Sequence, residues 1–203
     1  MRTQTFLEIL GANYIVAEAQ KLSSIPGING GWEVWLQVEI AKTFVALDNT
    51  WSFNREQPYQ NPLNGPAPWI AYNRQTKIAS YSRNRNSASK SDFSMLHAGN
   101  RDLTYLELKC INPNTNSASN DAWNRYRDDL NKIIGITKLD QSINGIALLA
   151  TYGTFPSIPN FDPNLTVYVW DPYEGTGRNG VSTMSDVKLN GNSRFFLVGC
   201  SVN

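Results

Sequence analysis

The sequence SDFSMLHAGNRDLTYLELKC, residues 91–110, decides the fold of this chain. Two runs, 92–97 and 104–111, have the composition of β-strands, and Gly99 and Asn100 between them are typical turn residues. The stretch therefore predicts two antiparallel strands that lie side by side.

Charged residues alternate with apolar ones on the second of these strands. Because successive side chains of a strand point to opposite faces, Glu107 and Lys109 share one face, while Leu106 and Leu108 share the other. Both faces carry apolar residues, which indicates a covered strand in the centre of a sheet. Pairing back from the turn places Asp92 opposite Glu107 or Lys109. Two carboxylates and one amine are therefore expected to converge.

Hydrophobic periodicity predicts the elements around this pair of strands. Helices are expected over residues 3–22, 32–46 and about 120–134, and strands over 50–60, 143–152, 165–171 and 194–202. Gly135 is expected to end the third helix. With 203 residues and no internal repeat or linker, the chain is predicted to be a single α/β domain, 1–203.

Composition excludes several kinds of catalytic site. His97 is the single histidine, so multi-histidine metal sites and most nucleophile–histidine sites are excluded, and no phosphate-binding glycine loop is present. Cys110 and Cys200 occur in apolar runs typical of buried free thiols, with a disulfide as the alternative. What remains for catalysis is carboxylates and lysine.

Charge and hydropathy indicate where such a protein works. The net charge is +1, so a nucleic-acid surface would have to be local. No apolar run is long enough to cross a membrane, and the first twenty residues lack the unbroken apolar segment of a signal peptide. We expect a cytoplasmic protein without a membrane partner.

The predicted site has the ligands that Mg²⁺ prefers. Asp92 and Glu107 offer two carboxylates, and the backbone carbonyl of Leu108 offers a third oxygen. Lys109 could orient or deprotonate a metal-bound water, or stabilise charge on a phosphate. The expected cofactor is Mg²⁺, for which Mn²⁺ is expected to substitute.

A further acid lies on the predicted helix over 32–46. Glu39 falls within its apolar stripe, between Leu36 and Ile40. Either it points to the metal site as a further ligand, or it meets a buried arginine or lies on a face that periodicity misplaces.

Basic residues without nearby acids precede Asp92. No Asp or Glu occurs between Gln57 and Ser91, and two further arginines lie on the helix over 120–134. These side chains are candidates for phosphate contacts, with an ordinary solvated hairpin and a solvated helix face beside Asp128 and Asp129 as the alternatives. The candidates are Arg74, Lys77, Arg83, Arg85, Lys90, Arg125 and Arg127.

The pattern resembles the PD-(D/E)XK nuclease superfamily, the restriction-endonuclease-like fold. The resemblance implies a core over about residues 32–152. It rests on Ser91-Asp92, on Glu107-Leu108-Lys109, on Glu39, and on the helix and buried strand that follow. Ser91 replaces the proline that names the motif. The resemblance implies a mixed central β-sheet flanked by helices, with Asp92 and Glu107 binding Mg²⁺ and Lys109 assisting the attacking water.

The function that this resemblance implies is a metal-dependent endonuclease that hydrolyses phosphodiester bonds of DNA, with RNA left open. Restriction enzymes often dimerise to cut both strands, so a homodimer is an arrangement that the resemblance allows. One alternative is a non-catalytic relative with the same fold, used as a binding, structural or immunity protein. Another is a different α/β fold in which Glu107 and Lys109 form a structural ion pair.

Overall fold

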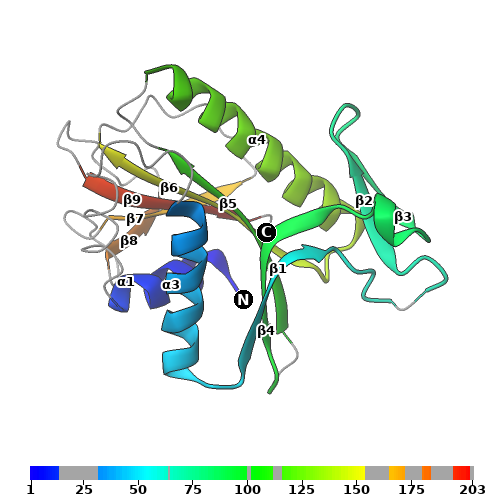
Figure 1. Ribbon diagram of the computed structural model, residues 1–203, viewed down its shortest axis with the longest axis horizontal. Helices are drawn as coiled ribbons and strands as arrows, with labels where there is room; N and C mark the ends of the chain where they lie inside the picture. The colour runs from blue at the N-terminus through cyan, green and yellow to red at the C-terminus, as the bar shows by residue number, and fades with distance from the viewer. Residues whose placement is uncertain are drawn as a thin grey trace.

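The computed structural model describes residues 1–13, 32–63, 65–99, 102–111, 116–153, 165–171, 180–183 and 194–201. These residues form a mixed α/β fold (Figure 1). The helices are α1 (Thr3–Ala12), α3 (Trp32–Leu47), α4 (Asn116–Leu139) and the short 3₁₀ helix η1 (Arg85–Ser87). The strands are β1 (Trp51–Pro58), β2 (Trp69–Asn73), β3 (Ile78–Ser82), β4 (Lys90–His97), β5 (Asp102–Ile111), β6 (Asn144–Gly153), β7 (Thr166–Trp170), β8 (Val181–Thr183) and β9 (Arg194–Ser201).

A seven-stranded sheet runs through the described part of the chain in the order β1-β4-β5-β6-β9-β7-β8. Strands β5 and β6 pair in parallel, whereas the other described pairs of this sheet are antiparallel. A parallel pair needs a crossover connection, and α4 lies in that connection. The sheet is therefore mixed, as the resemblance implied.

Each face of the sheet has its own apolar core. On one face, Leu106 and Leu108 of β5 pack with residues of α1 and α3. On the other, Tyr105 packs with Tyr126 and Ile133 of α4. Figure 1 shows α4 on one side of the sheet and α1 and α3 on the other. This confirms that β5 is a central strand covered on both sides, and it places the face of Glu107 and Lys109 under α4.

Helix α4 is longer than its periodicity predicts. It continues through Gly135 to Leu139, so the prediction that Gly135 ends the helix is wrong. A side chain at this position would meet the ring of Tyr72 at 2.8 Å. Gly135 therefore allows strand β2 to approach the helix, and buried Ile136 continues the apolar face beyond it.

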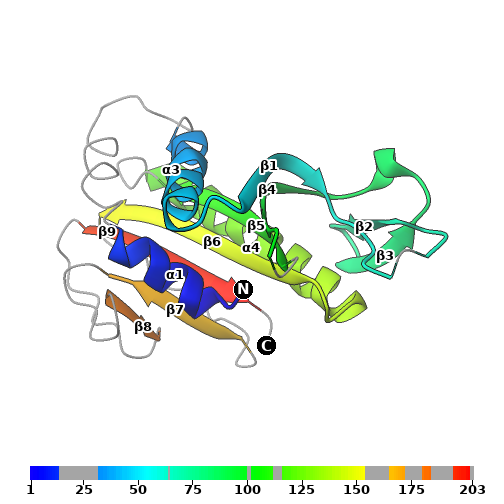
Figure 2. The same cartoon turned by 90° about the horizontal axis from the view of Figure 1, so that it is seen from below.

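Strands β2 and β3 form a separate two-stranded hairpin that extends from the main sheet (Figure 2). The hairpin packs on the C-terminal half of α4 through Tyr72, and the Tyr81 hydroxyl donates a hydrogen bond to Asp140 at 3.3 Å. Buried Ile70 and Ala79 join it to the core on this face. The basic segment expected from the sequence is therefore a hairpin beside α4.

The other sequence predictions can be compared with the described residues. The helix predicted over 32–46 and the strand predicted over 143–152 are confirmed by α3 and β6. The helix predicted over 3–22 begins at Thr3 as α1 but ends at Ala12, with Asn13 as its C-cap, and the segment 14–22 lies outside the described residues. The Cys110 thiol is free. Among the described helices, none has the length and hydropathy required to span a membrane.

Close contact between α4 and β6 predicts a stability effect at Gly145. A methyl group there would meet buried Ile133 at 2.8 Å, so Gly145→Ala should lower the free energy of unfolding by about 1–3 kcal/mol through overpacking. Urea denaturation measures this change. Gly65→Ala is the matched control, because its methyl group would make an ordinary 3.5 Å contact and should change stability by less than about 0.5 kcal/mol. Equal stability of the two variants would contradict the packing of α4 on β6.

Candidate metal and phosphodiester site

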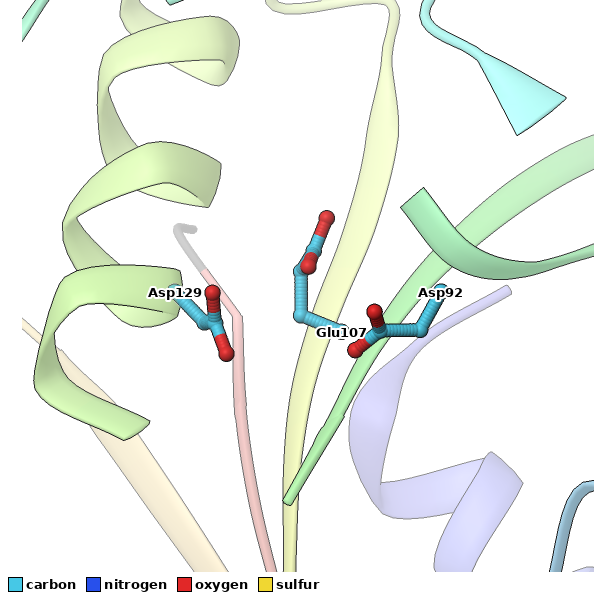
Figure 3. A group of neighbouring side chains, drawn as sticks. All are labelled: Asp92, Glu107 and Asp129. Atoms are coloured by element: carbon cyan, nitrogen blue, oxygen red, sulfur yellow. The ribbon is translucent and has the colours of Figure 1, made fainter. Parts of the chain in front are cut away.

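Three carboxyl groups from three elements converge under α4. Asp92 lies on β4, Glu107 on β5 and Asp129 on α4, and one oxygen of each lies within 4.8 Å of the others (Figure 3). The register explains the first two: Phe93 pairs with Leu106, so Asp92, one position earlier, comes opposite Glu107. Asp92 is also fixed by the backbone N–H of Leu108, which donates a hydrogen bond to its Oδ2 at 2.8 Å.

Two lysines compensate these carboxylates. Lys109 Nζ lies 3.2 Å from Asp129 Oδ2 and 3.6 Å from Asp92 Oδ2, and it donates a hydrogen bond to the Leu108 carbonyl at 3.0 Å. Lys132 Nζ lies 2.6 Å from Glu107 Oε2 and 3.8 Å from Asp129 Oδ1. Each lysine therefore contacts an acid of the other element: Lys109 of β5 contacts Asp129 of α4, and Lys132 of α4 contacts Glu107 of β5.

Glu107 is held on both of its oxygens. While Lys132 contacts Oε2, the buried Tyr59 hydroxyl donates a hydrogen bond to Oε1 at 2.6 Å. Tyr59 directly follows β1 and packs against Tyr105, with the two rings tilted and their centroids 4.5 Å apart. The carboxylate is therefore oriented by groups from two sides of the site.

Burial changes the acidity of these groups. Glu107 has only 1% of its surface exposed, and burial raises its pKa to about 8, although the Lys132 ammonium opposes the shift. Burial likewise raises the pKa of Asp129. For Lys109, burial lowers the pKa, but Asp129, Asp92 and Glu33 outweigh it, so the net shift is upward. Lys109 is therefore an ammonium at neutral pH.

The site opens into a cleft of about 510 Å³ between the β2–β3 hairpin and α4. Its lining residues are Glu56, Tyr72, Arg74, Ser89, Lys90, Asp92, Glu107, Lys109, Arg125, Asp128, Asp129 and Lys132. Of the seven predicted phosphate-contacting residues, Arg74, Lys90 and Arg125 line this cleft. The other four are exposed residues outside its lining: Lys77, Arg83, Arg85 and Arg127. Arg85 instead stacks over the Trp69 ring, 5.4 Å from its centroid.

The structure does not bring Glu39 to this site. Helix α3 packs on the opposite face of β5, and Glu39 forms an ion pair with Lys42 at 2.8 Å. Glu33 of the same helix accepts a hydrogen bond from the Cys110 N–H at 3.2 Å, so it reaches the end of β5. The interpretation of Glu39 as a further ligand is therefore corrected, because its helix covers the wrong face.

Asp129 and Lys132 are site residues that the sequence did not predict. Asp129 is predicted to lie on a solvated face, but its surface is 5% exposed and that of Lys132 is 6% exposed. A signal was present: Asp129 lies three residues after Tyr126 and four before Ile133, at the spacing of the buried stripe. An acid on such a stripe indicates a buried charged partner.

The oxygens of the site already surround a cation. The Lys109 ammonium lies among Asp92, Asp129 and the Leu108 carbonyl, which shows that carboxylate and carbonyl oxygens can converge on one positive charge. This donor set is also the oxygen-only chemistry that Mg²⁺ prefers. Because the carboxylate oxygens of Asp92, Glu107 and Asp129 also lie within 4.8 Å of one another, the carboxylates of this site fit a divalent cation.

The raised pKa of Glu107 predicts a pH-dependent stability. Between its ordinary pKa of 4.5 and about 8, the folded protein keeps a proton that the unfolded chain has lost, so stability falls as pH rises through this window. Without divalent cations, the melting temperature should fall by roughly 5–10 °C across it. Scanning calorimetry of wild type, Glu107→Gln and the control Glu39→Gln measures this. Glu107→Gln should flatten the profile, and a profile parallel to wild type would contradict the assignment.

Comparison with known proteins adds no relative to this description. No protein family, curated protein or solved structure matches the chain. The chemistry of the site therefore has to be argued from its own geometry.

Proposed function

We propose that the protein is a Mg²⁺-dependent endonuclease that hydrolyses phosphodiester bonds of DNA, on a restriction-endonuclease-like core. The observation that carries the proposal is the convergence of Asp92, Glu107 and Lys109 at a cleft lined by basic side chains. Acidic residues inside the cleft suit a metal ion, and cations around them suit the phosphates of a substrate.

The arrangement of the strands supports the resemblance noted in the sequence. Strand β4 carries Asp92, the neighbouring strand β5 carries Glu107 and Lys109, and α4 connects β5 to the parallel strand β6. The resemblance extends to chemistry, because the superfamily places two metal-binding acids and a lysine on two adjacent strands.

Each residue has a role in the proposed reaction. Asp92, Glu107 and the Leu108 carbonyl would hold Mg²⁺, which lowers the pKa of a bound water and compensates charge on the phosphate. In the hydrolysis, the oxygen of a water molecule forms a bond to phosphorus and its proton passes to solvent, while one P–O ester bond breaks and the leaving oxygen takes a proton from solvent. Lys109, an ammonium at neutral pH, orients the water and stabilises the negative charge that develops on the phosphate.

A plasmid-nicking assay tests the proposal. Wild type should cut DNA with Mg²⁺ or Mn²⁺ and not with EDTA. Asp92→Asn, Glu107→Gln and Lys109→Met should each lower the cutting rate at least about 100-fold, because each removes a ligand or the ammonium while keeping side-chain size. Glu39→Gln is the matched control, since this acid lies on the opposite face, and it should cut like wild type.

The outcomes separate the alternatives. Equal cutting by all variants, or no cutting by wild type, would sink the proposal and favour a structural ion cluster in a binding protein. A matched single-stranded RNA decides between the two nucleic acids. Nicked circles that accumulate before linear product indicate one strand cut at a time, whereas direct linear product supports the homodimer expected from the resemblance.

The basic lining of the cleft predicts a contribution to binding. Arg74→Met and Arg125→Met, each in an Asp92→Asn background that cannot cut, should weaken DNA binding several-fold and each reduce the slope of log affinity against log salt by about 1. Fluorescence anisotropy at a series of salt concentrations measures both quantities. Lys138→Met, an exposed cation on the same helix outside the cleft lining, is the control, and an equal loss in it would contradict a local phosphate contact.

A further inference from the structure

We infer that helix α4 carries two positioning residues for this site: Asp129, which holds the Lys109 ammonium, and Lys132, which holds the Glu107 carboxylate. This inference rests on the proposed function and deepens it. Neither residue belongs to the pair of strands that carries the acid–lysine pattern.

The two pairs cross between one strand and one helix. Strand β5 presents an acid and a lysine two positions apart, and α4 presents an acid and a lysine three positions apart, so that opposite charges meet at both positions. Residues two apart on a strand and three apart on a helix each share a face. The acid of each element therefore meets the lysine of the other. An exposed helix face would not require such matching.

Asp129 holds Lys109 away from a metal ligand. The ammonium is closer to Asp129, at 3.2 Å, than to Asp92, at 3.6 Å. Without the Asp129 charge, Asp92 would be the nearest carboxylate partner of Lys109, and the ammonium would lose the contact that fixes its position. Asp129 is therefore a positioning residue for the lysine that stabilises the reacting phosphate.

Lys132 joins three elements around Glu107. Its ammonium contacts Glu107 Oε2 at 2.6 Å and donates a hydrogen bond to the Lys90 carbonyl of β4 at 3.2 Å. Tyr59 holds the other oxygen of Glu107, and each carboxylate oxygen keeps a second lone pair that a metal ion can use. Lys132 and Tyr59 therefore fix the direction in which Glu107 offers its free lone pairs.

Two measurements distinguish these roles. Titration calorimetry with Mn²⁺ alone should show that Lys132→Met weakens binding about 10–100-fold and that Lys132→Arg restores most of it. Tyr59→Phe, which keeps the buried ring and therefore the fold, should weaken Mn²⁺ binding several-fold. Asp129→Asn should keep Mn²⁺ affinity within about 3-fold but lower kcat for plasmid cutting at least about 10-fold at nearly constant KM. Glu39→Gln should match wild type in both measurements.

Two contrary results would overturn the inference, one for Asp129 and one for Lys132. Asp129→Asn that loses Mn²⁺ affinity as fully as Asp92→Asn would make Asp129 a metal ligand. Unchanged Mn²⁺ affinity in both Lys132→Met and Tyr59→Phe, or no Mn²⁺ binding by wild type, would remove the role of Lys132.

The nuclease proposal can fail separately. If wild type binds Mn²⁺ but cuts no nucleic acid, only the nuclease proposal is contradicted. The Mn²⁺ affinities of the Lys132 variants then still test the positioning role of Lys132. The melting temperatures of Lys109→Met, Asp129→Asn and the double variant then test the pairing of Asp129 with Lys109. A double variant that melts no lower than the worse single variant supports the pairing, and strictly additive shifts overturn it.

Discussion

The buried contact between the Glu107 carboxyl group and Lys132 is the interaction on which the rest of this site depends. A carboxylate with 1% exposure is costly unless opposite charge and hydrogen bonds compensate it, and Lys132 and Tyr59 supply both. Because these partners come from α4 and from the segment after β1, the burial of one acid requires the helix and the strands to dock in one arrangement. The same requirement brings Asp129 to Lys109.

This arrangement connects stability with function. In the absence of a metal ion, two ammonium groups face three carboxyl groups, and the raised pKa of Glu107 keeps a proton in the site at neutral pH. A divalent cation would supply the missing positive charge, so its binding should release that proton. The charged groups that stabilise the contact between α4 and β5 are therefore the same groups that we propose bind a metal ion.

The two faces of the sheet explain which predictions succeeded. Alternation along β5 placed Glu107 and Lys109 on one side and Leu106 and Leu108 on the other, and both placements hold because the period of a strand is a local property. The predicted end of α4 was wrong, because Gly135 does not end the helix but leaves space for Tyr72 of the β2–β3 hairpin, a contact distant in sequence. The interpretation of Glu39 as a metal ligand was wrong for a similar reason, since periodicity defines the apolar stripe of a helix but not the sheet face that this stripe covers.

The sequence by itself determined the pair of strands, the convergence of Asp92 with Glu107 and Lys109, and the mixed α/β class, because turn residues and alternation act over a few positions. Only the tertiary structure decided which helix completes the site. Asp129 and Lys132 are buried among the charges of the site because α4 lies over β5 in the connection to β6. Glu39 is not among these charges because α3 packs on the other face. The rotation of a helix about its axis and its choice of sheet face depend on packing between distant segments, which local spacing does not encode.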